Sequence, residues 1–152
     1  MHGSYPRHCL DEDGKRHDGW VAQGHCAACD KYPSLIPDFI KPHKHYKADV
    51  IERAVGEAEA GGIIENLGGC AADVSTMRRW VREFKERGEQ AVKGLISKLP
   101  TVCEAHADPL VVRDLSLLQQ LDRLLREYPA SKSGGVIGRA NIILTTKNCG
   151  FL

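Results

Sequence analysis

Ala72-Asp-Val-Ser-Thr-Met-Arg-Arg-Trp-Val-Arg-Glu-Phe-Lys-Glu-Arg-Gly88 is the stretch around which the chain is organised. Its large apolar residues recur at steps of three and four, so they share the stripe of a helix that must be buried: Met77, Trp80, Val81 and Phe84. Asp73 or Ser75 can cap the first turn, and Gly88 stands where a left-handed C-cap is expected. The stretch therefore predicts one amphipathic helix whose two ends are both specified.

The other side of this helix is hydroxylated and basic, with Ser75, Thr76, Arg78, Arg79, Arg82 and Lys85. Hydroxyl groups and N-terminal amides suit phosphate oxygens, and arginine side chains suit guanine edges. This combination is typical of the recognition helix of a helix-turn-helix. The alternative is an ordinary surface helix whose arginines are simply solvated, and the stretch alone does not decide between the two.

Length and charge limit the possible functions of the chain. With 152 residues it has room for one domain of middling size or two small ones. The net charge is only +1, so any binding of nucleic acid must depend on local clusters of basic residues. No apolar run is long enough to span a bilayer or to act as a secretion signal, so we expect a cytoplasmic protein with no membrane partner.

The N-terminal region predicts a small β-hairpin that ends in a Cys-x-x-Cys pair. Residues 2–10 and 20–26 flank a polar segment that contains Asp13-Gly14, a favoured turn dipeptide. Cys26 and Cys29 have the spacing of one half of a zinc ribbon, which needs two further ligands. No second pair precedes the hairpin, so a knuckle without metal and an intact zinc site both remain open. Pro33 and Pro37 disfavour a thioredoxin-like redox motif, which needs a helix here.

Beyond the hairpin the pattern is mainly helical. Three prolines predict an extended, basic and solvated connector, after which residues 48–60 and 63–67 form a helix and a short turn, each closed by paired glycines. We expect further helices over 89–99, ended by Pro100, and over 110–128, with residues 136–146 either helix or strand. The predicted regions are 1–46, a partial zinc-ribbon-like hairpin and connector; 47–99, a helix-turn-helix region; and 100–152, a C-terminal helical region.

Six segments together carry a resemblance to a known family: His2 to Arg7, Cys26 to Cys29, Ser34 to Pro42, Tyr46, Val74 to Trp80, and Gly138 to Thr146. In this order they resemble a bacterial family of unknown function, whose members join a zinc-ribbon-like N-terminus to a helix-turn-helix. Such proteins are similar to the N-terminal part of insertion-sequence transposases. The resemblance implies a mainly α fold, a DNA partner and zinc as cofactor. The family's first Cys-x-x-Cys is expected before His2, and its absence leaves the site at Cys26 and Cys29 incomplete.

Catalysis is not expected from this chain. A transposase core needs acidic residues on a mixed sheet, whereas Asp108, Asp114 and Asp122 lie in or beside a helical segment. No phosphate loop, nucleophile motif or small-molecule site is recognisable. A non-catalytic DNA-binding protein is therefore the leading hypothesis. The alternatives are a module that dimerises through the helix over 110–127, a transposon-derived fragment that does not bind DNA, and a thiol- or metal-responsive protein.

Overall fold

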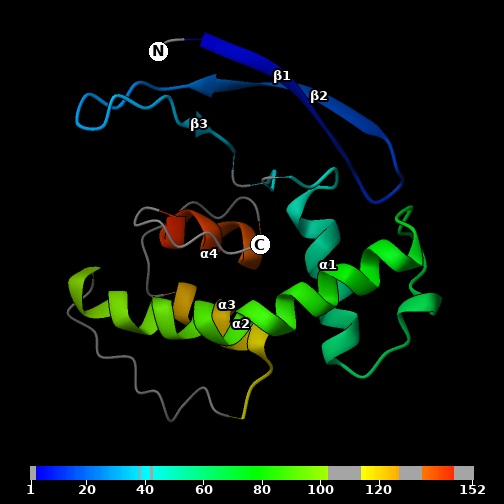
Figure 1. Ribbon diagram of the computed structural model, residues 1–152. Coiled ribbons are helices and arrows are strands. Elements are labelled where there is room, and N and C mark those ends of the chain that lie inside the picture. Colours follow the sequence, from blue (N-terminus) through cyan, green and yellow to red (C-terminus); the bar gives the residue numbers. More distant parts are fainter. Residues whose placement is uncertain (1–2, 38, 42, 103–113, 127–134, 146–152) are drawn as a thin grey trace.

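A three-stranded antiparallel sheet is followed by four α-helices in the computed structural model (Figure 1), which confirms the expected fold class. The structure describes residues 3–37, 39–41, 43–102, 114–126 and 135–145. The sheet arches over the helices, and the longest helix runs along the side of the molecule away from the sheet. The elements are β1 (Gly3–Leu10), β2 (Arg16–Gln23), β3 (Ser34–Leu35), α1 (Ala48–Glu59), the 3-10 helix η1 (Ile64–Asn66), α2 (Val74–Val102), α3 (Leu117–Leu125) and α4 (Gly135–Thr145).

The expected hairpin is present, with a tighter turn than the sequence indicated. β1 pairs with β2 from Gly3 opposite Gln23 to Leu10 opposite Arg16. Asp11 closes the turn because its Oδ1 accepts hydrogen bonds from the amides of Asp13 and Lys15, at 3.2 and 2.8 Å. Gly14 has a φ of 76°, a value that glycine adopts without strain. β2 therefore begins at Arg16, four residues before the predicted second strand.

α2 differs from the prediction at its C-terminal end. Asp73 acts as the N-cap, since its Oδ1 accepts from the Ser75 amide at 2.8 Å. The predicted stop at Gly88 is wrong, because the helix continues past this residue and past Pro100 to Val102. Gly88 is buried, and a Cβ there would lie 3.0 Å from Leu117 Cδ1. The glycine permits the close approach of α3, and no helix end is needed to explain it.

The hydrophobic core lies between the four helices and is centred on the apolar stripe of α2, with Trp80 2% and Phe84 0% exposed. α3 supplies Leu121 and Leu125, which are also buried. The described part of the helix predicted over 110–128 begins only at Leu117, because Ser116 forms a capping box with Gln119. Of the segment at 136–146, left open between helix and strand, the described residues 136–145 belong to helix α4.

Two carboxylates of α1 hold the N-termini of the two C-terminal helices. Glu59 accepts hydrogen bonds from the Ser116 hydroxyl at 2.8 Å and from the Leu117 and Leu118 amides at 3.0 Å each. Glu52, two turns earlier on α1, accepts from the Ile137 amide at the start of α4, at 3.2 Å. Because helix N-termini carry unpaired amides and a partial positive charge, α1 organises both helices through these two contacts.

Glu52 should make the stability depend on pH. Burial, opposed by hydrogen bonds from Ile137 and Val136, raises its pKa above the ordinary 4.5. The folded state then binds this proton more tightly than the unfolded state, so the free energy of unfolding falls as pH rises from about 4.5 through the raised pKa. We expect Glu52→Gln, which resembles the neutral form, to be more stable relative to the wild type at pH 7 than at pH 4. Urea unfolding of both proteins at the two pH values measures this, and an equal difference at both would contradict it.

The sheet and the helices are joined by the connector over residues 36–47. The amide of Leu10 donates to His45 O at 2.6 Å, and the amide of Lys47 donates to Leu10 O at 2.9 Å. Arg7 of β1 donates to Lys41 O at 2.6 Å. The connector is thus tied to β1 on one side and leads directly into α1 on the other.

Candidate nucleic-acid interface

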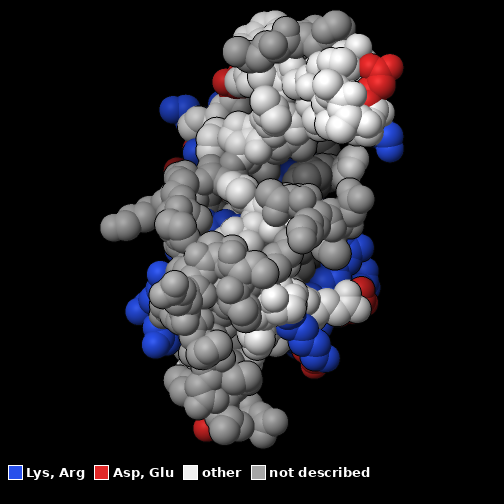
Figure 2. All heavy atoms as spheres, turned by 90° about the vertical axis from the view of Figure 1, so that its left-hand side faces the viewer, with Lys and Arg blue, Asp and Glu red and all other residues white. Residues whose placement is uncertain are grey.

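The first four turns of α2 divide into a buried and an exposed side. Met77, Trp80, Val81 and Phe84 lie in the core. On the opposite side Ser75, Arg78, Arg79, Arg82 and Lys85 are exposed, and Thr76 is half-buried. In Figure 2, lysine and arginine atoms are more frequent over the lower, helical part of the molecule than over the sheet. The basic side of α2 is therefore open to a partner.

The basic residues of α2 differ in how far they are already neutralised. Arg78, 63% exposed, forms an ion pair with Glu65 of η1. The pKa of Glu65 is lowered by a hydrogen bond from its own backbone amide and by the Arg78 side chain. Arg79, Arg82 and Lys85 form no ion pair within the described part of the chain. Among the predicted contact residues, the unneutralised positive charge therefore belongs to these three. The sequence offered no sign that Glu65 would reach Arg78 from the preceding turn.

The start of α2 is less suited to phosphate than its arginines are. Hydrogen bonds from the Ser75 side chain and backbone lower the pKa of the Asp73 carboxyl, so this group stays ionised at neutral pH. The carboxylate occupies the amides that a phosphate would otherwise use, and its charge repels an anion. Ser75 and Thr76, predicted to meet phosphate, are thus next to a negative charge.

Two lysines at the basic end of the connector make contacts inside the protein, where they stabilise the fold. The Lys41 side chain is 1% exposed, and its Nζ donates to Ile137 O of α4 at 2.7 Å. Lys44 is 13% exposed and forms an ion pair with Glu83 of α2. Both lysines join the connector to the helices, so the expectation of a fully solvated linker was wrong for these residues.

Cys26 and Cys29 lie in a tight turn after β2, where the Cys29 amide donates to Cys26 O at 3.3 Å. The pKa of Cys26 is lowered, first by a hydrogen bond from the Cys29 thiol and then by the amides of Cys29 and Ala28. Two cysteines at this spacing in a tight turn suit half of a tetrahedral zinc site. Among the described residues, however, no group of three or more His, Cys, Asp or Glu side chains is placed to hold a metal ion.

The nearby histidines are occupied by other contacts. His25 Nε2 lies 2.7 Å from Asp30 Oδ1, and its ring stacks on Tyr32. His17 Nε2 lies 2.6 Å from Asp11 Oδ2, while His8 stacks on His45. The described residues therefore offer two cysteines that could bind zinc and no third candidate ligand beside them, so we assign no metal-dependent step to the chain.

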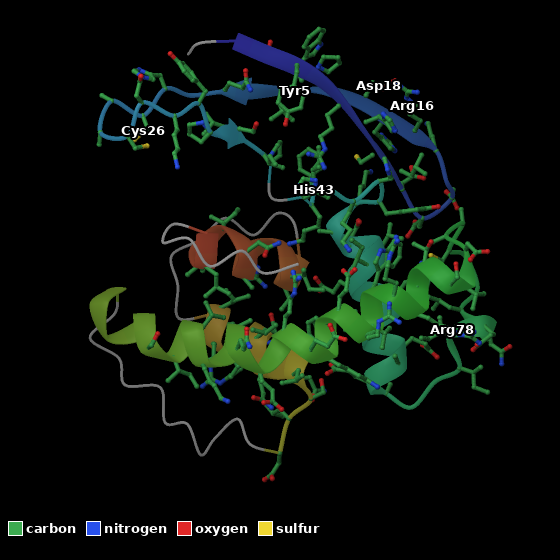
Figure 3. All side chains as sticks on the ribbon, in the orientation of Figure 1. Tyr5, Arg16, Asp18, Cys26, His43 and Arg78 are labelled. Carbon is green, nitrogen blue, oxygen red and sulfur yellow. The ribbon has the colours of Figure 1, made fainter. Side chains whose placement is uncertain are left out.

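The cysteine turn and the basic side of α2 are separate features. Figure 3 shows Cys26 at one end of the sheet and Arg78 on the far side of the molecule, beside η1. Metal bound at the cysteines would brace the sheet without touching the arginines.

The leucine stripe predicted to dimerise is largely used inside the chain. Leu121 and Leu125 are 0% and 1% exposed, and Leu115 and Leu118 are half-buried. Val111 lies outside the described residues. Packing against α1, α2 and α4 therefore accounts for most of the stripe.

Comparisons with known proteins bear on the N-terminal half of the chain. No curated protein and no solved structure matches the chain. No helix in the described part of the chain combines the length and apolar character needed to cross a membrane. A family match covers the sheet, the cysteine turn, the connector, α1, η1 and the start of α2 as far as Trp80. By this match over residues 1–80, more than half of its length, the chain belongs to the family described as a domain of unknown function, DUF6431.

Proposed function

We propose that this protein is a non-catalytic DNA-binding protein that contacts duplex DNA through the exposed basic side of α2. The observation that carries the proposal is the set of exposed, unneutralised cations Arg79, Arg82 and Lys85 on a helix whose other side is anchored in the core. A rigid helix with a basic outer side can lie against phosphates and base edges in a major groove. We further propose a relationship to the helix-turn-helix of insertion-sequence transposases.

The arrangement before α2 supports this proposal. α1 and η1 pack against α2, as the first helix and turn of a helix-turn-helix pack against its recognition helix. Tyr46, just before α1, meets the Trp80 ring edge-on with 5.2 Å between ring centres. Non-catalytic action is part of the proposal because Asp122 is bound by Arg126 at 2.7 Å and by Arg139 at 3.2 Å, contacts that oppose metal binding.

Replacing Arg79 and Arg82 together with Ala tests the proposal. We expect DNA affinity to fall by at least about tenfold, and the slope of log K against log salt to become shallower by about two, one for each lost phosphate contact. Fluorescence anisotropy with a labelled duplex of mixed sequence, measured over a range of salt concentrations, gives both quantities.

The double variant Arg123→Ala with Arg126→Ala is the matched control. It removes the same formal charge from the C-terminal end of α3, where both residues are exposed and Arg126 is paired with Asp122 at 2.7 Å, and it leaves α2 intact. Binding should weaken much less than in the α2 variant. Equal losses in the two variants would show that only net charge matters, and unchanged affinity in the α2 variant would remove α2 as the contact surface.

A further inference from the structure

A cavity of about 420 Å³ opens between the free edge of β2 and the connector, away from the basic side of α2. β3 pairs only with Ala22 and Gln23, so it leaves the outer edge of β2 uncovered from Arg16 to Val21. The cavity lies beside this uncovered edge. Figure 3 shows Arg16 and Asp18 at the opposite end of β2 from Cys26, which separates the cavity from the cysteine turn.

The cavity is built on a rigid floor. Cys9 and Val21, on neighbouring strands, are 2% and 1% exposed, and Ile40 of the connector is 7% exposed. The connector wall is fixed because the Ala48 amide donates to Phe39 O at 2.9 Å and the Ile40 amide donates to Pro37 O at 3.0 Å. Burial raises the pKa of the Cys9 thiol, so it stays neutral and adds an apolar surface. The site is therefore formed before any ligand arrives.

Two large aromatic residues line this cavity and remain exposed. Trp20 of β2 is 71% exposed and Phe39 of the connector is 43% exposed. Large aromatic residues usually contribute to cores and interfaces, so a pair of them around a preformed cavity indicates a ligand with a flat apolar surface.

The polar lining requires that the ligand also carries hydrogen-bonding groups. Lys47 supplies an ammonium group, and Asp49 and Asp18 supply carboxylates, of which that of Asp18 is already paired with Arg16 at 2.7 Å. Asp49 Oδ1 accepts from the Val50 amide at 2.8 Å, while its Oδ2 has no hydrogen bond within the described residues. His17 lies on the same lining and is oriented by Asp11 at 2.6 Å. A carboxylate accepts hydrogen bonds from an amino group, and an ammonium donates to a carbonyl or a phosphate.

We propose that this cavity binds an unpaired nucleobase that carries an exocyclic amino group. The base stacks on Trp20 and Phe39, its amino group donates to Asp49, and Lys47 meets the carbonyl oxygen or the adjoining phosphate. Single-strand binding sites combine aromatic stacking with nearby cations in this way. Cytosine, adenine and guanine have the required amino group, and thymine does not. The site extends the proposed function from duplex DNA to an unpaired base, and it uses none of the α2 arginines.

The two tryptophans make this proposal measurable in the whole protein. Trp20 is exposed at the cavity, whereas Trp80 is 2% exposed in the core and reports on folding. Titration with single-stranded dC octamer should quench the exposed emission in a saturable manner, and Trp20→Phe should abolish that quenching. The dT octamer should bind at least about fivefold more weakly, since it lacks the amino group.

Phe39→Ala should weaken binding of the dC octamer by about tenfold, because it removes one stacking surface and keeps Trp20 as reporter. Tyr32→Ala is the matched control, since Tyr32 is 46% exposed and lies outside the cavity lining. Circular dichroism and Trp80 emission verify that each variant is folded.

The outcomes separate the cavity from α2. The base-binding assignment is wrong if the dC octamer does not quench Trp20 emission, or if it quenches Phe39→Ala and the wild type equally. Either result overturns it even when duplex DNA still binds through α2. A preference for dT over dC likewise contradicts it. Quenching that persists in the Arg79 and Arg82 double variant supports a separate site. If the double variant is still quenched by the dC octamer and the wild-type protein does not bind duplex DNA, the proposed α2 function is wrong and the cavity assignment stands.

Discussion

Trp80→Ala should lower the free energy of unfolding by about 3–5 kcal/mol, the usual cost of truncating a large buried aromatic residue. Trp80 is 2% exposed and lies on the apolar stripe of α2. Its ring also meets Tyr46 edge-on, so the truncation removes an aromatic contact that links the connector to α2. Since natural domains are stable by only about 5–15 kcal/mol, the variant should be close to unfolding at 25 °C.

Trp20→Ala is the matched control for this effect, because it removes the same side chain from a position that is 71% exposed. It should change the free energy of unfolding by no more than about 0.5 kcal/mol. Urea unfolding followed by circular dichroism measures both variants. If Trp80→Ala is too unstable to measure, Trp80→Phe can replace it. This variant keeps a ring against Tyr46, so it should lower the free energy of unfolding by less than Trp80→Ala does. Equal midpoints for Trp80→Ala and Trp20→Ala would contradict the burial that the structure assigns to α2.

The parts of the fold that depend on local patterns could be predicted from the sequence. The polar segment with the turn dipeptide Asp13-Gly14 indicated the hairpin, and glycine pairs marked the ends of α1 and of the turn containing η1. The stripe through Trp80 and Phe84 identified the buried side of α2. These signals are local because hydrogen bonds within one turn or one helix determine them.

Features that depend on distant residues could not be predicted in this way. Gly88 has the sequence signature of a helix end, yet it is required by the close approach of Leu117. The ion pair between Glu65 and Arg78 joins different elements, and so does the buried contact of Lys41 with Ile137 O. For the candidate site, sequence reasoning found the basic residues but could not tell which of them are already neutralised. Among the described residues, Arg79 and Arg82 therefore carry free positive charge, whereas Arg78 is already paired with Glu65.

Glu59 shows most clearly how a tertiary contact outweighs a local preference. It is the last residue of α1, where the partial negative charge of the helix end disfavours a carboxylate. The structure places this carboxylate at the N-terminus of α3, where it accepts three hydrogen bonds from Ser116, Leu117 and Leu118. The Glu59 carboxylate is unfavourable at the C-terminus of α1 and favourable at the N-terminus of α3. The three hydrogen bonds that it accepts there outweigh the unfavourable interaction with α1.

Glu59→Ala should therefore lower the free energy of unfolding by about 2 kcal/mol, since it leaves the Leu117 and Leu118 amides without this acceptor. The capping box between Ser116 and Gln119 remains, so α3 should still form. Glu57→Ala is the matched control, because Glu57 is an exposed glutamate on the same turn and its side chain forms no hydrogen bond with the described residues. Urea midpoints, compared at unchanged m-value, measure both variants. If Glu57→Ala costs as much as Glu59→Ala, the effect belongs to the charge of α1, and the proposed anchoring of α3 by Glu59 is wrong.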